Sequence, residues 1–266
     1  MVIKMSKKYS KEKTVLITGC TSGIGYELAE IFAKNKYRLI LVSRNKSKLI
    51  VQKRKYVAQG LQVISIATDL SKVDAAKKLF DALKTEKIHI LVNNAGVGDY
   101  GLFSGGDWKK IHSMMNLNMI TLTRLTHLIL PQMITRGEGK ILNVSSVAGF
   151  QPGPMMAVYF ATKAYVTSFS QAIAKEVEDY GITITSLCPG GTQSNFMKSS
   201  GMDESQMMQG KKLPSSRLVA EFGYDALMKG KLVAIHGFGN KFMACLIKFV
   251  PRKVLLSIMY KLMKPK

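Results

Sequence analysis

The sequence contains few cysteines and no long apolar run. Its three cysteines, Cys20, Cys188 and Cys245, are odd in number, far apart and never spaced as CxxC among the 266 residues. Small disulfide scaffolds are dense in cysteine, so this class is excluded and we expect three reduced thiols. No window reaches the roughly 18 uninterrupted apolar residues that a membrane-spanning helix needs. The nearest window, residues 242–263, is interrupted by Lys248 and by Pro251 with two basic residues.

The first 13 residues also lack the apolar centre of a signal peptide. This segment reads MVIKMSKKYSKEK and is basic throughout. A secretory signal needs an apolar region of about 7–15 residues after its basic start. We therefore expect a cytoplasmic protein.

Acidic residues are scarce relative to basic ones. The chain has 17 Asp+Glu against 39 Lys+Arg, a formal net charge of +22, and 47% apolar residues. This apolar content excludes a disordered chain and suits one globular domain over residues 1–266. Residues 31–68 and 226–266 each hold nine Lys/Arg and no acid. Such regions attract anions, although many of these lysines are expected simply to be solvated, and no motif supports a nucleic-acid partner.

Short apolar strand patterns alternate with helical patterns along the chain. This order predicts a doubly wound, Rossmann-type α/β fold, a parallel sheet with helices on both faces. The expected strands are residues 14–18, 38–43, 61–68, 88–92, 140–145 and 182–187. The expected helices are residues 26–35, 49–59, 73–85 and 157–180, with one or two further helices over residues 108–134. Residues 195–216 have little periodicity and are expected to form a substrate loop with short helices.

A glycine-rich turn joins the first expected strand to the first expected helix. Its sequence is T-G-C-T-S-G-I-G, residues 18–25. A dinucleotide pyrophosphate needs a close backbone approach and free N–H groups at a helix N-terminus. Gly19 permits the tight turn, Gly23 lets the backbone approach the phosphates, and Gly25 lets the helix pack on the strand. The alternative is a tight turn without a ligand, but the position after a strand and before a helix favours a dinucleotide site.

This turn resembles the cofactor turn of the short-chain dehydrogenase/reductase family, in its compact subtype. Further motifs follow in that family's order over about residues 14–196. They are Asn93-Asn94-Ala95-Gly96, Asn118, Ser145-Ser146, Tyr159 with Lys163, and Pro189-Gly190-Gly191-Thr192. The resemblance implies cofactor contacts from Gly19, Thr21, Ser22, Gly23, Ile24, Gly25, Asp69, Leu70, Asn94, Ala95, Gly96, Tyr159, Lys163, Pro189, Gly190 and Thr192.

The end of the second expected strand, Val42-Ser43-Arg44, carries no acid. An acid at this place would accept hydrogen bonds from the adenosine ribose and favour NAD. Arg44 instead offers a planar cationic fork that suits a 2′-phosphate, and Ser43 and Asn45 can add hydrogen bonds. We therefore expect NADP(H) as the cofactor. The alternative is that Arg44 is a solvated loop cation.

Tyr159 and Lys163 are four residues apart and project from one face of a helix. A free tyrosine has a pKa of about 10, and a neighbouring ammonium is expected to lower it. Tyr159 would then act as general acid in carbonyl reduction and as general base in alcohol oxidation. The resemblance adds Ser146, thirteen residues before Tyr159, as the group that orients the substrate oxygen, and Asn118 as the holder of a proton-return water. No metal site is expected, because the four histidines have no ligand spacing.

Apolar and methionine-rich segments are expected to form the substrate pocket. These segments are residues 98–106, 150–158, 195–216 and the C-terminus. They favour a bulky lipophilic alcohol or ketone of hydroxysteroid or bile-acid type over a sugar, and the positive field would assist an anionic one. The alternatives are a 3-oxoacyl thioester reductase and, in a different class, a non-catalytic NADP-binding sensor.

The C-terminal segment, residues 241–266, is basic and amphipathic, with seven Lys/Arg and no acid. We expect a lid or packing element first and a peripheral membrane contact second. The family resemblance also implies a homodimer or homotetramer.

Overall fold

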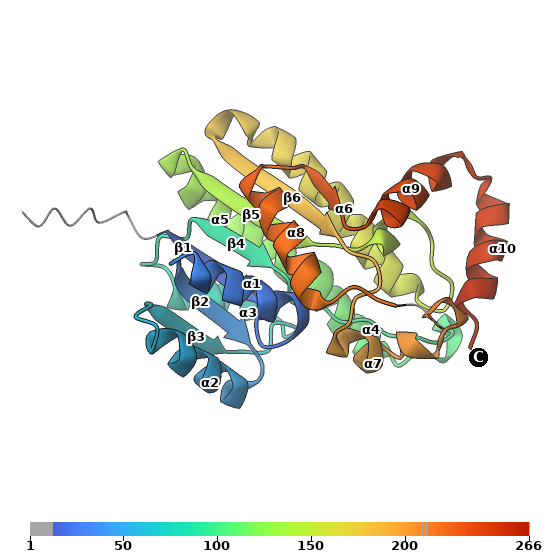
Figure 1. The fold of residues 1–266 in the computed structure, drawn as a ribbon, viewed down its shortest axis with the longest axis horizontal. Coiled ribbons are helices and arrows are strands. Elements are labelled where there is room, and N and C mark those ends of the chain that lie inside the picture. Colours follow the sequence, from blue (N-terminus) through green and yellow to red (C-terminus); the bar gives the residue numbers. More distant parts are fainter. Residues whose placement is uncertain (1–12, 209, 211, 266) are drawn as a thin grey trace, which may run out of the picture.

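A computed structural model describes residues 13–208, 210 and 212–265 of the chain. Seven parallel strands form one sheet in the order β3-β2-β1-β4-β5-β6-β7 (Figure 1). The strands are β1 (Thr14–Thr18), β2 (Arg38–Ser43), β3 (Val63–Ala67), β4 (Ile90–Asn93), β5 (Gly139–Val144), β6 (Ile182–Cys188) and β7 (Val233–Ile235). This sheet confirms the predicted fold class. The segment from which a signal peptide was excluded lies outside the described residues except for Lys13.

The strand order reverses at β1, which pairs with β2 on one side and β4 on the other. All five residues of β1 are buried, because helices cover both faces of the sheet at this position. In open parallel sheets, ligands bind beyond the carboxyl ends of the strands at such a reversal. The loops after β1 and β4 therefore enclose the place where a ligand is expected.

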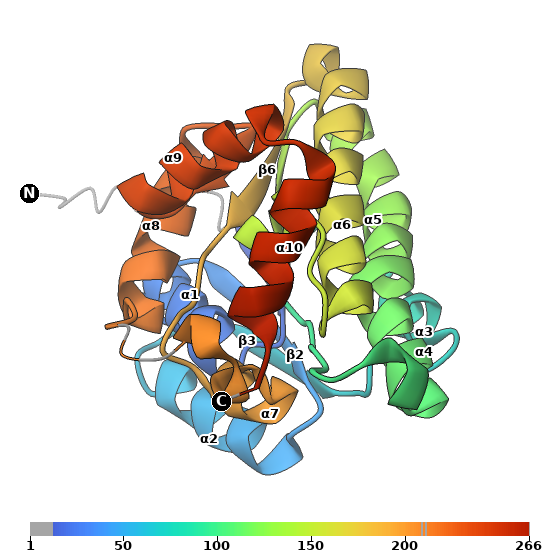
Figure 2. The ribbon, with the colours of Figure 1, turned by 90° about the vertical axis from the view of Figure 1, so that its right-hand side faces the viewer.

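The helices form two layers on the sheet. They are α1 (Gly23–Lys34), α2 (Lys46–Val57), α3 (Ala75–Ala82), α4 (Trp108–Met115), α5 (Leu122–Arg136), α6 (Ala157–Glu176), α7 (Asn195–Ser200), α8 (Ser216–Met228), α9 (Phe238–Leu246) and α10 (Arg252–Met263). One apolar cluster joins α1, α2 and α8 to one face, and another joins α3, α5 and the end of α6 to the other face. Figure 2 shows α1 and α8 separated from α5 and α6 in this way.

Several element bounds differ from the sequence expectations by one to three residues, and helix α8 was not expected. Strand β7 was not expected; it is three residues long and pairs only with β6 along the described chain. The region 108–134, expected to hold one or two helices, is α4 and α5 joined by a π-helical turn, Asn116–Thr121, and α5 continues through Pro131 to Arg136. The expected helix 157–180 ends at Glu176, and a 3-10 turn, Glu178–Tyr180, follows it.

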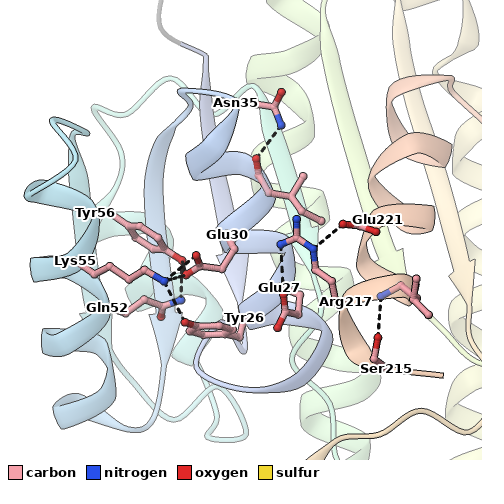
Figure 3. A network of polar contacts seen from close by, with 12 residues as sticks. Tyr26, Glu27, Glu30, Asn35, Gln52, Lys55, Tyr56, Ser215, Arg217 and Glu221 are labelled. Carbon is pink, nitrogen blue, oxygen red and sulfur yellow. Dashed lines mark hydrogen bonds and ion pairs between the residues drawn. The ribbon is translucent and has the colours of Figure 1, made fainter. Parts of the chain in front are cut away.

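Helix α1 is held from both sides by polar contacts (Figure 3). On the α2 side, Glu30 accepts hydrogen bonds from Lys55 Nζ at 2.7 Å and from the buried Tyr56 hydroxyl at 2.6 Å. On the α8 side, Arg217 contacts Glu27 at 3.4 Å and Glu221 at 2.6 Å. These contacts fix the helix that carries the glycine turn at its N-terminus.

The last two helices lie at the carboxyl ends of the strands. Helices α9 and α10 project from one end of the molecule in Figure 1, and α10 lies in front in Figure 2. The end of α10 is tied to the body, because Tyr100 Oη donates to the Met263 carbonyl at 2.5 Å and Gln206 N donates to the Lys264 carbonyl at 3.1 Å. Among the described helices, none is long and apolar enough to cross a membrane.

Candidate active site

A cavity of about 700 Å³ lies beyond the carboxyl ends of the strands. Its polar half is built from the loops that follow β1 to β6. Its apolar half is built from α7, the two short 3-10 helices after it, α9 and α10. A cavity of this size, with a few polar groups converging on one part, is typical of a small-molecule site.

The glycine turn forms one wall of the polar half. Gly19 has φ +67°, and a Cβ on it would lie 2.9 Å from the backbone of Ala95. Gly25 lies behind this wall, where a Cβ would lie 2.4 Å from the Gly19 carbonyl oxygen. Helix α1 has no acid in its first turn, and the Ser22 side chain caps none of its amides within the described chain. The amides at this N-terminus therefore remain available for an anion.

The loop after β4 holds the glycine turn in place. Asn94 Nδ2 donates to the carbonyls of Thr18 and Gly19, both at 3.0 Å. The Thr18 hydroxyl accepts from the Asn94 and Ala95 amides at 3.0 and 3.1 Å. Where β1 and β4 diverge, the Asn94 and Thr18 side chains take the place of backbone hydrogen bonds between the two strands. These bonds keep the glycine turn in its shape.

The end of β2 brings a cation and a hydroxyl pair to the cavity. The Ser43 and Thr21 hydroxyls are 2.8 Å apart, and the exposed Arg44 lines the wall beside them. Asn45 also lines the cavity, but its side chain caps α2 by accepting from Lys48 N at 2.9 Å. Burial by itself raises the pKa of the Asp69 carboxyl. Hydrogen bonds from Ser71 and the charge of Arg44 outweigh it and keep that pKa below its usual value.

Tyr159 and Lys163 lie buried on the first turns of α6 and line the cavity floor. Lys163 Nζ is 5.8 Å from the centre of the Tyr159 ring and donates to the Val144 carbonyl at 2.8 Å. Burial raises the pKa of Tyr159 to about 12, against a lowering by the Ser146 hydroxyl. Burial lowers the pKa of Lys163 to about 8. The expectation that the ammonium lowers the phenol pKa is therefore not met in this structure, because desolvation is the larger effect.

The two serines at the end of β5 have different surroundings. Ser145 is buried, and its hydroxyl donates to the Lys163 carbonyl at 2.8 Å and lies 2.7 Å from the Thr167 hydroxyl. Ser146 accepts from Ala148 N at 3.1 Å and donates weakly to the Pro189 carbonyl at 3.3 Å. Ser145 is thus held by contacts that fix α6, whereas Ser146 lines the cavity with these two contacts, and its role toward a substrate oxygen stays a prediction.

Asn118 lies behind the cavity wall, in the π-helical turn between α4 and α5. Its Oδ1 accepts from Val97 N at 3.0 Å, and its Nδ2 donates to the Val97 carbonyl at 2.9 Å and to the Thr162 hydroxyl at 3.1 Å. The side chain therefore joins the loop after β4 to α6. This arrangement makes Asn118 a positioning residue rather than part of the lining.

The loop after β6 closes the polar half. Pro189, Gly190 and Thr192 line it, and the Thr192 hydroxyl donates to the Gly190 carbonyl at 3.0 Å. Asn240 of α9 packs so closely that a Cβ on Gly190 would lie 2.5 Å from its Nδ2. Sequence reasoning missed Asn240, because only the tertiary position of α9 brings it to this loop.

All other predicted site residues line the same cavity, and only Gly25 and Asn118 stand behind its wall. The predicted residues on the lining are Gly19, Thr21, Ser22, Gly23, Ile24, Ser43, Arg44, Asn45, Asp69, Leu70, Asn94, Ala95, Gly96, Ser146, Tyr159, Lys163, Pro189, Gly190 and Thr192.

The apolar half differs in part from the expected pocket. No residue of the segment 98–106 lines the cavity. In the segment 150–158, Gln151 alone lines it. The Phe196 ring lies 5.3 Å from the Tyr159 ring, so the apolar half begins beside the phenol. The remaining apolar lining comes from Met197, Met202, Met207, Met208, Met243, Ala244, Leu246, Ile247, Val250, Leu255, Ile258, Met259 and Leu262.

Comparisons with known proteins agree with this arrangement. Residues 13–205 match the short chain dehydrogenase family model. Very-long-chain 3-oxoacyl-CoA reductase-B of Danio rerio is 35% identical over 182 residues, which cover 66% of this chain and 58% of that protein. Hydroxysteroid dehydrogenase-like protein 1 of Gallus gallus is 36% identical over 194 residues, covering 70% of this chain and 57% of that protein. The chain thus spans little more than half the length of these curated relatives.

Among solved structures, a short-chain dehydrogenase from Sphingobium yanoikuyae in complex with NADPH superimposes with a TM-score of 0.81. It is 30% identical, and the match covers 92% of this chain and 95% of that one. The likeness extends beyond the family-model match, because it includes most of the residues after 205.

Proposed function

This chain belongs to the short-chain dehydrogenase family, and from that premise we propose that it is an NADP(H)-dependent oxidoreductase that interconverts a ketone and a secondary alcohol on a long lipophilic substrate. The family binds nicotinamide cofactors. The observation that carries the proposal is one continuous cavity. It runs from the glycine turn, past Tyr159, to an apolar half formed by α7, α9 and α10.

The polar half fits a phosphorylated dinucleotide. The α1 N-terminus would hold the pyrophosphate, and the Thr192 loop would contact the nicotinamide end. Arg44 and Ser43 would bind a 2′-phosphate, because a guanidinium fork matches its oxygens and the end of β2 offers no carboxylate against it. When bound, this cofactor supplies or accepts the hydride.

The chain's own residues supply the proton and the orientation. The Ser146 hydroxyl would hold the substrate carbonyl oxygen, and Tyr159 Oη would donate a proton to it during reduction. Because burial raises its pKa to about 12, Tyr159 is a neutral phenol at pH 7, the form that reduction needs. The Lys163 charge stabilises the phenolate formed when that proton leaves. Asn118 would keep α6 and the loop after β4 in register through its three hydrogen bonds.

A 3-oxoacyl thioester is the substrate class that we place first. The apolar half is lined by flexible methionine and leucine side chains, which can follow an alkyl chain. The zebrafish relative, whose name states a 3-oxoacyl-CoA reductase, supports this class. This order reverses the sequence-based preference for a hydroxysteroid, which becomes the second candidate. The methionine-rich wall and the chicken relative's name support that candidate.

Absorbance of NADPH with a panel of ketones tests the proposal. The panel comprises 3-oxoacyl thioesters of increasing length, ketosteroids and oxo bile acids. We expect turnover with NADPH and a kcat/KM that rises with acyl length. Higher kcat/KM on ketosteroids would select the second candidate. NADPH binding without turnover of any ketone would instead indicate the sensor, the alternative of a different class.

A further inference from the structure

Helix α9 and the short 3-10 helix after it carry an exposed aromatic stripe. Phe238, Phe242 and Phe249 are 87%, 59% and 79% exposed. Their spacing of four and seven residues places them on one side of the helix, and the exposed Cys245 lies between them. Large apolar side chains gathered on one exposed face mark an interaction site rather than chance exposure.

Exposed cations surround this stripe. Lys241 on α9 and Lys248 on the 3-10 helix Ile247–Phe249 flank it, and Lys253, Lys261 and Lys264 follow the outward side of α10. In the described part of the chain, the basic residue of every ion pair is Arg217 or an earlier residue. The cations on α9 and α10 are therefore not paired with an acid. Residues 226–266 contain no acid at all. The face therefore combines apolar side chains with an uncompensated positive field.

Residues of the same two helices also line the cavity. Met243 and Leu246 of α9 and Ile258 and Leu262 of α10 line the cavity and are between 42% and 51% exposed. On the same side of α10, Leu255 and Met259 also line the cavity, and with Met263 they are buried against the body. The helices that carry the aromatic stripe and the cations are thus also walls of the apolar half of the cavity.

We propose that α9 and α10 form a docking face for the surface of an anionic lipid bilayer, with the cavity mouth turned toward the lipid. A basic amphipathic helix pair can lie in the interface, with aromatic rings among the headgroups and lysines on the phosphates. A second copy of this chain fits less well, because a two-fold contact places each basic face against another. The docking itself is independent of the proposed function. The consequence that a lipophilic substrate enters between α9 and α10 rests on that function.

Vesicle flotation with the full chain tests the docking. We expect the protein to float with phosphatidylcholine vesicles that contain phosphatidylglycerol and not with phosphatidylcholine alone. Binding should be lost in about 1 M salt, where the screening length is about 3 Å. Replacing Lys253 and Lys261 by Gln should weaken partitioning by about 30-fold. The triple variant Phe238→Ser, Phe242→Ser, Phe249→Ser should weaken it by at least about 100-fold.

Matched controls lie at the opposite end of the molecule. Tyr180→Ser removes an exposed aromatic ring, and Lys84→Gln with Lys87→Gln removes two exposed cations. Both should float like the wild type. Turnover of a short soluble ketone by the triple variant shows that it is folded, since its three rings do not line the cavity.

Three results would overturn the proposal. One is that the protein stays off anionic vesicles, and another is that the Tyr180 or Lys84/Lys87 control loses as much binding as the α9 and α10 variants. The third is self-association that the triple variant abolishes, without vesicle binding, which would make the face a contact between copies. Absence of ketone turnover by the wild-type protein would instead contradict the proposed function and leave the docking result unaffected.

Discussion

At the scale of single residues, burial and charge act against each other on the cavity floor. Tyr159 and Lys163 are both removed from water, and burial disfavours the charged form of each. The Tyr159 phenol therefore stays protonated at neutral pH and can donate its proton. The pKa of the Lys163 ammonium, about 8, lies close to neutral pH. A pair with these two properties suits reduction at neutral pH better than oxidation.

Removing the phenol oxygen tests the role of Tyr159. In Tyr159→Phe we expect kcat for ketone reduction to fall by about 10²–10⁴-fold, because the proton donor is lost. NADPH binding, followed by fluorescence, should change little. Tyr165→Phe is the matched control on the same helix, since its hydroxyl meets Thr123 on the surface at 2.8 Å. Retained turnover in Tyr159→Phe would refute the acid/base role.

The two pKa values also predict how the rates depend on pH. Reduction needs the neutral phenol and a charged Lys163, so its kcat should be flat up to about pH 8 and fall above it as the ammonium deprotonates. Oxidation needs the phenolate, and since burial raises the pKa of Tyr159, its kcat should rise with pH over the same range. Steady-state rates in both directions, with a neutral ketone and its alcohol, measure this. A reduction rate that increases with pH would contradict the assignment.

Arg44 is the residue on which the NADP preference depends. Arg44→Asp should lower the ratio of kcat/KM for NADPH to that for NADH by about 10–100-fold, because a charge-assisted contact becomes a repulsion. Lys46→Asp makes the same change of charge two residues away, outside the cavity lining. An equal loss of preference in both variants would mean that the general positive field, and not Arg44, selects the cofactor.

The sequence predicted residues with local signals better than residues defined by distant contacts. The glycine turn, the Tyr159–Lys163 spacing and the two serines are local, and the fold brings them to one cavity. Asn240 could not be found, because it reaches Gly190 only after α9 has packed. The raised pKa of Tyr159 was also missed, because desolvation depends on burial that no local motif encodes.

At the scale of elements, strands with a clear local pattern were predicted better than short or irregular elements. Strands β1 and β2 were predicted to the residue, because each is a short apolar run bounded by turn residues. Strand β7 has three residues at the edge of the sheet and too few side chains to show a period. The π-helical turn itself was not predicted, because its extra residue serves the Asn118 contacts with Val97 and Thr162 rather than a sequence pattern.

Helix α10 forms one wall of the apolar half, and we expect that it can be loosened without unfolding the rest of the protein. Replacing the fully buried Met263 by Ala and Tyr100 by Phe removes its last apolar contact and the hydrogen bond to the Met263 carbonyl. The methionine change alone is expected to cost about 2–5 kcal/mol of local packing. We expect KM to rise more for long acyl substrates than for short ones. Limited proteolysis should cut α10 more readily than in wild type.

Ser257→Ala is the control for α10, because its hydroxyl bonds only within the helix, to the Lys253 carbonyl at 3.0 Å. It should leave both KM and proteolysis unchanged. An α10 that resists proteolysis in the double variant, with unchanged KM values, would show that the helix is held by contacts other than these.

At the scale of the whole molecule, the net charge of +22 sets the field that a substrate meets on approach. Fields of one sign raise association rates of opposite charges and weaken with salt. At saturating NADPH, kcat/KM for an anionic acyl-CoA should therefore fall between low salt and about 1 M salt. A neutral ketone of the same length should change little. Equal salt dependence for both substrates would show that the field does not steer the substrate.

The partial exposure of Met243, Leu246, Ile258 and Leu262 also bears on which chain lengths the protein accepts. A closed pocket rejects a molecule that is too long, because its end collides with the wall. If the mouth lies between α9 and α10, as the docking proposal places it, a longer tail can pass out there instead of clashing. The protein would then select for a minimum tail length and no maximum, because short tails lose contacts with the wall and long tails extend beyond the protein.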